Sequence, residues 1–475
     1  MKPRVNPVRK ESRSSNGVNR RTFLSNALLG GAGLLILKNS HSAYSYESNE
    51  KLNIALIGVG GRGSWFVDAI PNLGQNIVAM CDVNDRKATA SYKAVPQAKK
   101  FRDFRKMLDE MNRNIDAVIV ATPDHTHAVA TAAAMRAGKG VYCEKPLTHN
   151  IREARMLREL AAKYKVATQM GNQGTSSEAF RRAVELVWAG VIGDVREVHA
   201  WNTGGGPGDQ PVPTDEHPVP EYLHWDLWLG PAKYRPYNSR WLDWHGWRDF
   251  GTGQLGNWAS HTMNLPFKAL LLDTLWNQQS GSSVKHLVRL EPEVSGVHKH
   301  AFPKWEIIRY DFPARGDMPP VRINWYNGSG QAPGPRDMIE QMMGKRLDWG
   351  DAGEKKWQDH AGCLLVGSKG MIHSTGHNMS FTLLPEDKFK DFEGPARTLP
   401  RSRGHESEWL QACRGGPAAM SNFNYADPLA EFVLLGNVAT LVGETVEFDP
   451  LEMKFVNNPQ ANAALEREYR QGWSL

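Results

Sequence analysis

The segment KLNIALIGVGGRGSWFVDAI, residues 51–70, is the strongest indication of the fold of the first domain. A short apolar run, 54–57, leads directly into a Gly-x-Gly-x-x-Gly pattern, and a helical pattern follows it. Glycines in this order let the backbone approach a pyrophosphate at a helix N-terminus. The strand before and the helix after strengthen a spacing that is weak by itself. We predict a dinucleotide-phosphate loop made of Gly58, Gly60, Gly61, Arg62 and Gly63.

An acidic residue follows the second strand-like run. The run NIVAMCD ends in Asp82, 19 residues after Gly63. A carboxylate at this point accepts hydrogen bonds from the adenosine ribose hydroxyls and repels a 2′-phosphate. The cofactor predicted from these residues is therefore NAD(H) rather than NADP(H). The alternative is a glycine-rich turn that packs a helix on a sheet without a ligand.

Three further apolar runs, at 116–123, 140–146 and 166–174, become polar at their C-terminal ends. Helical patterns at 127–137 and 151–164 separate them. Buried strands that alternate with helices predict a parallel sheet, and ligands bind beyond the C-terminal edges of its strands. This arrangement brings four polar residues to the cofactor edge: Thr122, His127, Glu144 and Lys145.

Metal and disulfide sites are not expected. His125 and His127 flank a helix start next to Asp124, but a spacing of two residues points their imidazoles apart. The four cysteines, at 81, 143, 363 and 413, lack metal-ligand spacing. Cys81 and Cys143 fall on opposite halves of one predicted sheet, beyond the roughly 7 Å that a disulfide spans between Cα atoms. We predict that both cysteines are buried packing residues.

The N-terminal segment reads as an export signal. Residues 19–37, NRRTFLSNALLGGAGLLIL, place Arg20 and Arg21 before a weakly apolar stretch too short for a membrane span, which needs roughly 20 residues. Small residues at 40–45 offer cleavage sites. The pattern predicts twin-arginine export of a folded protein to the periplasm or beyond, without a stable membrane span after processing. The alternative is a disordered basic tail beside a short core helix.

Charge and composition limit the partners. Residues 1–45 hold eight Lys and Arg and one acid, so removing them turns the formal net charge of +6 into about −1. The remaining chain then lacks an electrostatic reason to bind nucleic acid. Its length predicts two domains. Tryptophans gather between residues 188 and 258, which suits a cleft facing a sugar ring.

Six segments together resemble the Gfo/Idh/MocA oxidoreductase family, named for glucose-fructose oxidoreductase and inositol dehydrogenase. They are GVGGRG at 58–63, CD at 81–82, ATPDHTHA at 121–128, EKPL at 144–147, GNQG at 171–174 and GTGQLGNWASH at 251–261. The similarity covers about 51–450. WDLWLGP at 225–231 and GWRDFG at 246–251 resemble the branch of the family that is exported by the twin-arginine route.

The resemblance implies an α/β fold with two domains. An N-terminal Rossmann domain, a doubly wound parallel sheet, would cover 51–174, and a C-terminal α/β domain with a large, mostly antiparallel sheet would cover 175–450, followed by a tail at 451–475. The residue patterns agree: they predict helices at 178–189, 258–271 and 429–442 and strands at 194–202, 284–291, 305–312, 321–327, 363–367 and 380–384. We also expect a homo-oligomer that forms through the second sheet.

The resemblance also assigns catalytic residues. Lys145 matches the active-site lysine of the family, and His261 matches its catalytic histidine. Family members usually carry an aspartate four residues before that histidine, whereas this chain has Asn257. An amide can orient a hydroxyl or an imidazole but supplies no negative charge. Four residues before this helix are candidates for substrate contact: Trp244, His245, Trp247 and Arg248.

These observations predict an exported NAD(H)-dependent oxidoreductase. It would transfer hydride between a secondary alcohol of a sugar, polyol or glycoside and a tightly held cofactor. A cofactor loaded before export would have to be recycled in place. One alternative is an NAD-assisted glycosidase that works by oxidation, elimination and re-reduction. The other, kept open by Asn257, is an inactive sugar-binding protein that retains NAD as structure.

Overall fold

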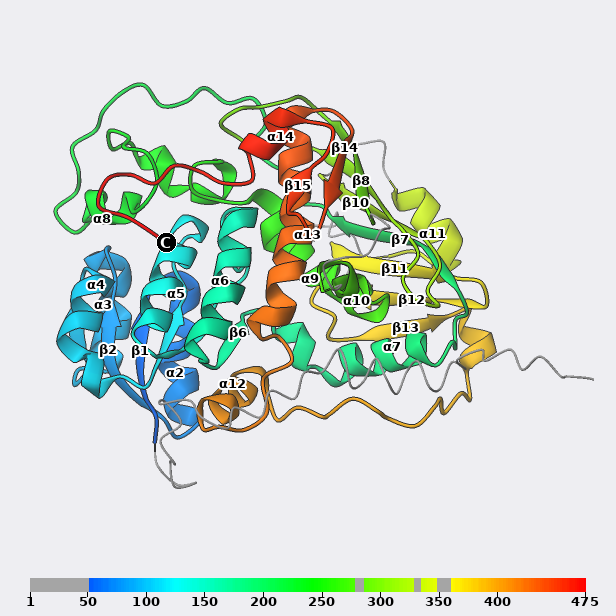
Figure 1. Ribbon diagram of the computed structural model, residues 1–475, viewed down its shortest axis with the longest axis horizontal. Helices are drawn as coiled ribbons and strands as arrows, with labels where there is room; N and C mark the ends of the chain where they lie inside the picture. The colour runs from blue at the N-terminus through cyan, green and yellow to red at the C-terminus, as the bar shows by residue number, and fades with distance from the viewer. Residues whose placement is uncertain (1–50, 278–285, 329–334, 348–359) are drawn as a thin grey trace, which may run out of the picture. The chain divides into compact units, whose positions relative to one another are not determined.

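The computed structural model describes residues 51–277, 286–328, 335–347 and 360–475 (Figure 1). The predicted export signal, its Arg20-Arg21 pair and the cleavage region at 40–45 lie outside the described residues. They stay predictions. Among the described residues, no helix is both long and apolar enough to cross a membrane.

The first sheet has six strands in the order β3-β2-β1-β4-β5-β6, and every neighbouring pair is parallel. The predicted Rossmann topology is therefore confirmed. The short strand β3 is not predictable from its sequence, because two of its three residues are exposed lysines and the strand has no apolar pattern. The strands are β1 Asn53–Ile57, β2 Asn76–Cys81, β3 Lys99–Phe101, β4 Ala117–Val120, β5 Gly140–Cys143 and β6 Thr168–Met170.

Helices cover this sheet, and polar side chains fix where several of them begin. The Asn84 side chain accepts a hydrogen bond from the Lys87 amide at the start of α3. Asn150 and Glu153 form a reciprocal capping box at the start of α6. The helices are α2 Ser64–Asn72, α3 Asp85–Ala94, α4 Phe104–Met111, α5 His127–Arg136 and α6 Ile151–Tyr164.

The second sheet has nine strands in the order β13-β12-β11-β7-β10-β9-β8-β14-β15. Only the neighbours β7 and β10 run parallel, so the predicted mostly antiparallel sheet is confirmed. The strands are β7 Val195–Asn202, β8 Val288–Val294, β9 Glu306–Phe312, β10 Val321–Asn327, β11 Ala361–Gly367, β12 Gly370–Thr375, β13 Phe381–Leu384, β14 Val446–Asp449 and β15 Lys454–Phe455.

The helix predicted at 258–271 is not one regular helix. It consists of a π-helix, Leu255–Ala259, then α9 Ser260–Thr262 and α10 Asn264–Ala269. Pro266 lacks the amide that would donate to residue 262, which favours a break just before it. A π-turn is frequent at functional sites, and this one contains Asn257.

Two of the remaining helices pack against elements of the first domain. Helix α13 packs beside α6 in Figure 1 and is joined to it by an ion pair between Arg155 and the buried Glu431. Helix α12 packs on the first sheet, where Trp409 meets Tyr142 edge-on at 5.8 Å between ring centroids. The helices are α7 Glu178–Trp188, α8 Trp225–Leu229, α11 Arg336–Met343, α12 His405–Cys413, α13 Phe423–Val442 and α14 Pro459–Ala463.

All four cysteines are free, and the three at 81, 143 and 363 are buried. Cys81 ends β2 and Cys143 ends β5, with β1 and β4 between them. The prediction that these two thiols pack in the core without bridging is confirmed. The domain boundaries at 174 and 450 stay predictions, because α12 belongs by sequence to the second half yet packs on the first sheet.

Candidate functional site

The loop after β1 requires glycine at two positions. A Cβ atom on Gly58, which has φ +81°, would lie 2.6 Å from the Ala121 carbonyl oxygen, and one on Gly63 would lie 1.9 Å from the Gly58 carbonyl oxygen. Gly61 has φ +53° and faces open space. Only residues without a Cβ atom let the loop lie this close to the sheet edge, and Gly61 leaves its outer side bare for a ligand.

Asp82 closes this loop from the end of β2. Its Oδ2 accepts hydrogen bonds from the Val59 and Gly60 amides at 2.9 and 3.0 Å, and its Oδ1 accepts one from the Asn84 amide at 2.8 Å. A carboxylate has about four acceptor sites, so one remains for a further donor. The residue predicted to bind ribose therefore also shapes the glycine loop.

A cavity of about 260 Å³ lies at the C-terminal edge of the first sheet. It reaches from Asp82 and Asn84 at one end to Glu144 and Lys145 at the other. The structure brings most of the predicted cofactor and substrate residues to this cavity. Those that line it are Gly58, Gly60, Gly61, Arg62, Asp82, Thr122, His127, Glu144, Lys145, Trp244 and His245.

The cavity residues fit NAD. The bare glycine loop sits at the start of α2, and the carboxylate of Asp82 stands at the end of the neighbouring strand. The buried Thr122 hydroxyl in the cavity wall has no hydrogen-bond partner within the protein. A ligand with several hydroxyl and phosphate oxygens would supply the partners that these groups lack. NAD held here would have Asp82 at its adenosine ribose and the glycine loop at its pyrophosphate.

Glu144 and Arg62 join the loop to the end of β5. The Arg62 Nε donates to Glu144 Oε1 at 2.8 Å, and the carboxylate is buried while the guanidinium is partly exposed. The guanidinium also lies 5.3 Å from the centre of the Phe66 ring. Glu144 thus fixes the arginine at the cavity wall, where it can face a phosphate.

The two histidines of the segment at 121–128 serve different neighbours. The ring nitrogens of His127 lie 2.7 Å from the Pro146 carbonyl and 2.8 Å from the Thr122 carbonyl. Those of His125 lie 3.2 and 2.8 Å from the carbonyls of Phe250 and Trp228. Burial lowers the pKa of His127 to about 4 and that of His125 to about 3. His127 therefore positions the Lys145-Pro146 turn beside the cavity rather than presenting a free nitrogen to it.

Lys145 and Asn257 contact each other directly. The Lys145 Nζ donates a hydrogen bond to the Asn257 Oδ1, and the Asn257 Nδ2 donates to the Gln254 Oε1 at 3.2 Å. Burial lowers the pKa of Lys145, although Glu144 and Asp124 partly offset it. No carboxylate accepts from the ammonium among the described residues. Two of the three predicted catalytic residues, Lys145 and Asn257, are thus neighbours, and the partner of Asn257 is the lysine.

His261 lies within the electrostatic reach of Lys145 but does not line the cavity. It is 4% exposed, its Nδ1 has no hydrogen-bond partner, and no hydrogen bond joins it to Asn257 in the part of the chain that is described. Its ring centroid lies 4.5 Å from that of His377. Burial lowers its pKa well below the usual value, and the charge of Lys145 adds to this shift. His261 is therefore a neutral imidazole near Lys145.

The sequence pattern suggests no role for Asp124 other than that of a metal ligand beside His125 and His127, yet its carboxyl group belongs to the site. It lines the cavity, is 1% exposed, and accepts a hydrogen bond from the Thr252 hydroxyl at 2.5 Å. Burial raises its pKa to about 7, against the opposing effects of Thr252 and Lys145. The only local signal for this residue is its position at the polar end of a buried strand. Its partner Thr252 lies 128 residues away, so no local pattern could reveal the pair.

The four predicted substrate residues separate into two pairs. Trp244 and His245 line the cavity with stacked rings, 3.6 Å between centroids. Trp247 is instead buried, and its Nε1 donates to the Arg240 carbonyl at 2.8 Å. Arg248 donates to the His298, Ala301 and Asn437 carbonyls and to the Thr440 hydroxyl. The polar groups of Trp247 and Arg248 are thus bonded to the protein away from the cavity, and the two residues hold the loop in place.

No cluster of potential metal ligands occurs in the described ranges. The site therefore consists of a glycine loop, an acid after β2, and a lysine beside an amide and an imidazole. A nucleotide cofactor and a hydroxyl substrate could meet at the Lys145 end of the cavity, where a half-buried amine is available to exchange a proton.

Comparison with known proteins agrees with this geometry. Residues 52–172 match the NAD-binding Rossmann fold of the Gfo/Idh/MocA oxidoreductase family, and residues 208–315 match the C-terminal alpha/beta domain of the same family. The chain resembles the WlbA dehydrogenase from Bordetella pertussis, crystallised with NADH and UDP-GlcNAcA. That match has a TM-score of 0.54 and 14% identity over 83% of this chain and 98% of the other.

Two curated relatives match shorter stretches. Inositol 2-dehydrogenase from Salmonella paratyphi B is 27% identical over 152 residues, which is 31% of this chain and 45% of the relative. A glycosyl hydrolase family 109 protein from Saccharopolyspora erythraea is 29% identical over 213 residues, 39% of this chain and 45% of the relative. The matches thus span less than half of each relative. Both family matches, the parallel sheet and the glycine loop show that the chain is an NAD-binding member of the Gfo/Idh/MocA oxidoreductase family.

Proposed function

We propose that the protein is an NAD-dependent oxidoreductase that acts on the CH–OH group of a sugar or polyol. Bound NAD would supply a hydride acceptor at C4 of the nicotinamide. The chain must then supply a group that removes the hydroxyl proton. The observation that carries the proposal is the half-buried Lys145 amine, which lies in the cofactor cavity and is bonded to the neutral amide of Asn257.

The surroundings of Lys145 suit an amine that exchanges a proton. Burial lowers its pKa, and the amide of Asn257 supplies no full negative charge to hold it as an ammonium. A neutral amine could accept the proton of the substrate hydroxyl. His261, a neutral imidazole nearby, could orient the same oxygen. Lys145 would act as the base and His261 as the orienting group.

The substrate class is inferred from the cavity mouth and from the relatives. Trp244 and His245 present a stacked aromatic pair at the cavity, and aromatic faces pack against the apolar faces of sugar rings. Burial, together with the charge of Lys145, lowers the pKa of His245 to about 4, so this ring is neutral. The names of the relatives, an inositol dehydrogenase and a dehydrogenase crystallised with a nucleotide sugar, fit a polyhydroxylated ring.

Incubation of the purified protein with a panel of sugars and polyols tests this proposal. NADH absorbance is followed in the presence of added NAD and, separately, with whatever cofactor co-purifies. The expected result is substrate-dependent reduction of NAD, in at least a single turnover when the cofactor does not exchange. Binding of sugars without any change in cofactor redox state would favour the inactive binding protein instead.

A second candidate is an NAD-assisted glycosidase. The similarity to a glycosyl hydrolase family 109 protein favours it. Oxidation and re-reduction within one turnover would cleave a glycosidic bond with no net change in NAD. Release of an aryl aglycone without NADH accumulation would identify this reaction. NADH accumulation with intact glycosides would exclude it.

We also propose that the folded protein is exported through the twin-arginine route, which would explain a cofactor loaded before transport. The support is Arg20-Arg21 followed by the weakly apolar stretch up to residue 37. Replacing both arginines by lysine should leave precursor in the cytoplasm, because a receptor reads the arginine pair. N-terminal sequencing should place processing within 40–45. Normal export of the double variant by the same route would contradict the proposal.

Self-association through the second sheet is a further part of the proposal. Arg309 and Arg322 form ion pairs with acids of the neighbouring strands on this sheet, at Glu293 and Asp311. Arginines and carboxylates that pair within one sheet can also pair between two copies of the sheet that are related by a twofold axis. Light scattering at several concentrations should show a species larger than one chain, and a monomer at all concentrations would contradict this part.

A further inference from the structure

The C-terminal tail returns to the first domain after α14, as the red trace in Figure 1 shows. Arg467 donates to the His125 carbonyl at 2.6 Å, and the Tyr469 hydroxyl donates to Glu153 at 2.7 Å. Arg470 pairs with Asp226 and donates to the Gly230 carbonyl at 3.1 Å. These bonds hold residues 467–470 across the α5, α6 and α8 region, so the last residues have a defined path.

This path ends at the cofactor cavity. Trp473 is half-buried and lines the cavity together with Arg102, Asp103 and Phe104. The Arg105 guanidinium lies 4.2 Å from the centre of the indole ring and donates to the Gly472 carbonyl at 3.3 Å. The Phe104 ring is 6.0 Å away between centroids. The indole is thus held at the cavity wall by the start of α4.

The sheet order identifies which end of the cavity this is. Residues 102–104 follow β3, and β3 lies outside β2, whose end carries Asp82. In a Rossmann fold the acid after β2 marks the adenosine half of the cofactor. Lys145 follows β5, on the other side of β1 and β4. Trp473 therefore stands at the adenine end, and the proposed chemistry stands at the opposite end.

We propose that Trp473 forms part of the adenine subsite, so that the C-terminus of the chain helps to hold the cofactor. An indole at a cavity wall offers a flat apolar surface, and aromatic rings stack on nucleobases irrespective of sequence. The inference rests on NAD being the ligand of this cavity. It adds a contact supplied by the chain end to those of the glycine loop and Asp82.

The location predicts a specific pattern of ligand dependence. A contact at the adenine end should act on any ligand that contains the adenosine half and leave a ligand without it unaffected. The probes are NAD, NADH, ADP-ribose and AMP on one side and nicotinamide mononucleotide on the other. Removing one base-stacking contact should weaken the first group about 5- to 100-fold.

The experiment titrates these ligands by calorimetry into the wild type and into Trp473→Ala, Trp473→Leu and Trp473→Phe. Leucine keeps apolar volume against Phe104 and the Arg105 side chain but has no ring, whereas phenylalanine keeps a ring. We expect Ala and Leu to lose affinity for the adenosine ligands and Phe to retain most of it. Tyr234→Ala is the matched control, since Tyr234 is 63% exposed and does not line the cavity.

Three results would overturn the inference. They are unchanged or tighter NAD binding by Trp473→Ala, equal affinities of the Leu and Phe variants, and equal losses for nicotinamide mononucleotide. If the Ala variant fails to fold, the Leu and Phe pair still decides. Failure of the cofactor assignment looks different, because then the wild type itself binds none of the adenosine ligands. Sugar turnover is not needed for either result.

Discussion

At the scale of single residues, the proposed proton chemistry depends on the contact between Lys145 and Asn257. A carboxylate at position 257 would stabilise the ammonium form of a half-buried lysine, whereas an amide accepts one hydrogen bond without a net charge. Asn257 thus orients Lys145 without adding a negative charge that would oppose the lowering of its pKa by burial. The departure from the usual aspartate supports a lysine that is more readily deprotonated.

Asn257→Asp should therefore shift the pH dependence of turnover. The new carboxylate would raise the pKa of Lys145, so the neutral amine would form only at higher pH. We expect the rising limb of the kcat profile to move to higher pH and the rate at neutral pH to fall. NAD affinity should stay the same. A limb that moves to lower pH, or does not move, would contradict the role of Lys145 as a base.

Asp82→Ala should weaken binding of NAD(H) by about 1–3 kcal/mol, the range for hydrogen bonds to a charged group. Its loss also frees the Val59 and Gly60 amides that now bind the carboxylate. Removing the negative charge should reduce discrimination against NADP(H). Titration of both nucleotides measures the change. Unchanged affinity for both nucleotides would show that Asp82 does not contact the bound cofactor.

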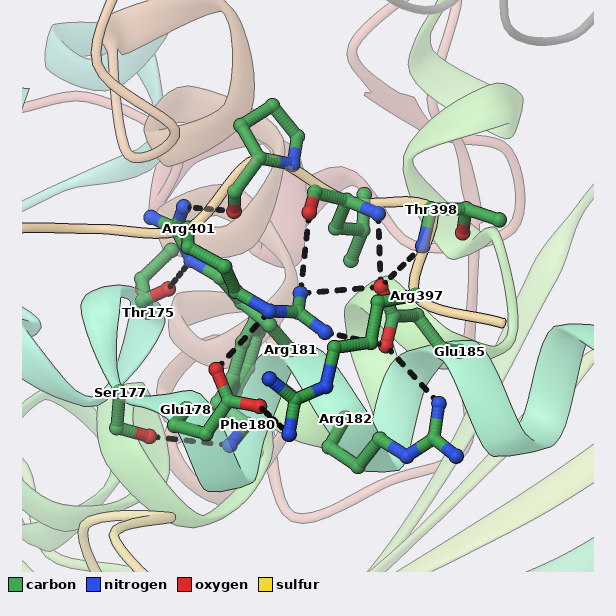
Figure 2. Close-up of polar contacts among 12 residues, drawn as sticks. Thr175, Ser177, Glu178, Phe180, Arg181, Arg182, Glu185, Arg397, Thr398 and Arg401 are labelled. Atoms are coloured by element: carbon green, nitrogen blue, oxygen red, sulfur yellow. Dashed lines mark hydrogen bonds and ion pairs between the residues drawn. The ribbon is translucent and has the colours of Figure 1, made fainter. Parts of the chain in front are cut away.

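At the scale of elements, α7 is joined to the segment at 395–401 by buried charges, shown in Figure 2. Glu185 accepts hydrogen bonds from the Thr398 and Leu399 amides, both at 2.7 Å, and from the Arg401 guanidinium. Arg181 donates to the Thr175 and Pro400 carbonyls and pairs with Glu408 of α12. A long irregular segment is thereby fixed between α7 and α12.

Glu185 should make stability depend on pH. Burial alone would raise its pKa, but the bonds from Arg401, Leu399 and Thr398 lower it to about 2. A group whose pKa is lowered by folding stabilises the protein above its ordinary pKa of 4.5 and loses this effect as the pH falls towards 2.

Glu185→Gln is neutral at every pH and serves as the comparison. At pH 7 the wild type should be more stable than this variant by about 1–3 kcal/mol, since bonds to a charged group are lost. The difference should shrink between about pH 4.5 and 2. Thermal unfolding of both proteins across this range measures it. A difference that stays constant with pH would exclude Glu185 as its source.

The elements also show what the sequence could and could not predict. Helix α6 has the predicted bounds because its apolar period and capping box are local signals. Strand β3 and the π-helix at Leu255–Ala259 were missed, since tertiary contacts rather than local patterns stabilise them. The cavity residues of the first domain follow strand ends and could be predicted. Asp124 with Thr252, and Trp473, could not, because their partners are distant in sequence.

At the scale of the whole molecule, three separate parts of the chain meet at one cavity. The strand ends of the first sheet supply the glycine loop, Asp82 and Lys145, the loop before the π-helix supplies Trp244 and His245, and the C-terminus supplies Trp473. A cofactor enclosed by segments so distant in sequence can be held only after the chain has folded. This dependence fits the proposed export of a folded, loaded protein.

The most direct test of the proposed chemistry is hydride transfer by Lys145→Met, with His261→Ala measured in parallel. Both variants should retain NAD. Lys145→Met should nearly keep the wild-type melting temperature because methionine replaces the apolar stem of the lysine, whereas His261→Ala removes a buried ring and should lower it. With the sugar that the wild type turns over fastest, reduction of bound NAD should slow by about 10²–10⁴, the usual share of positioned acid–base catalysis. Turnover by Lys145→Met at the wild-type rate, with NAD bound, would show that Lys145 is not the base that accepts the hydroxyl proton.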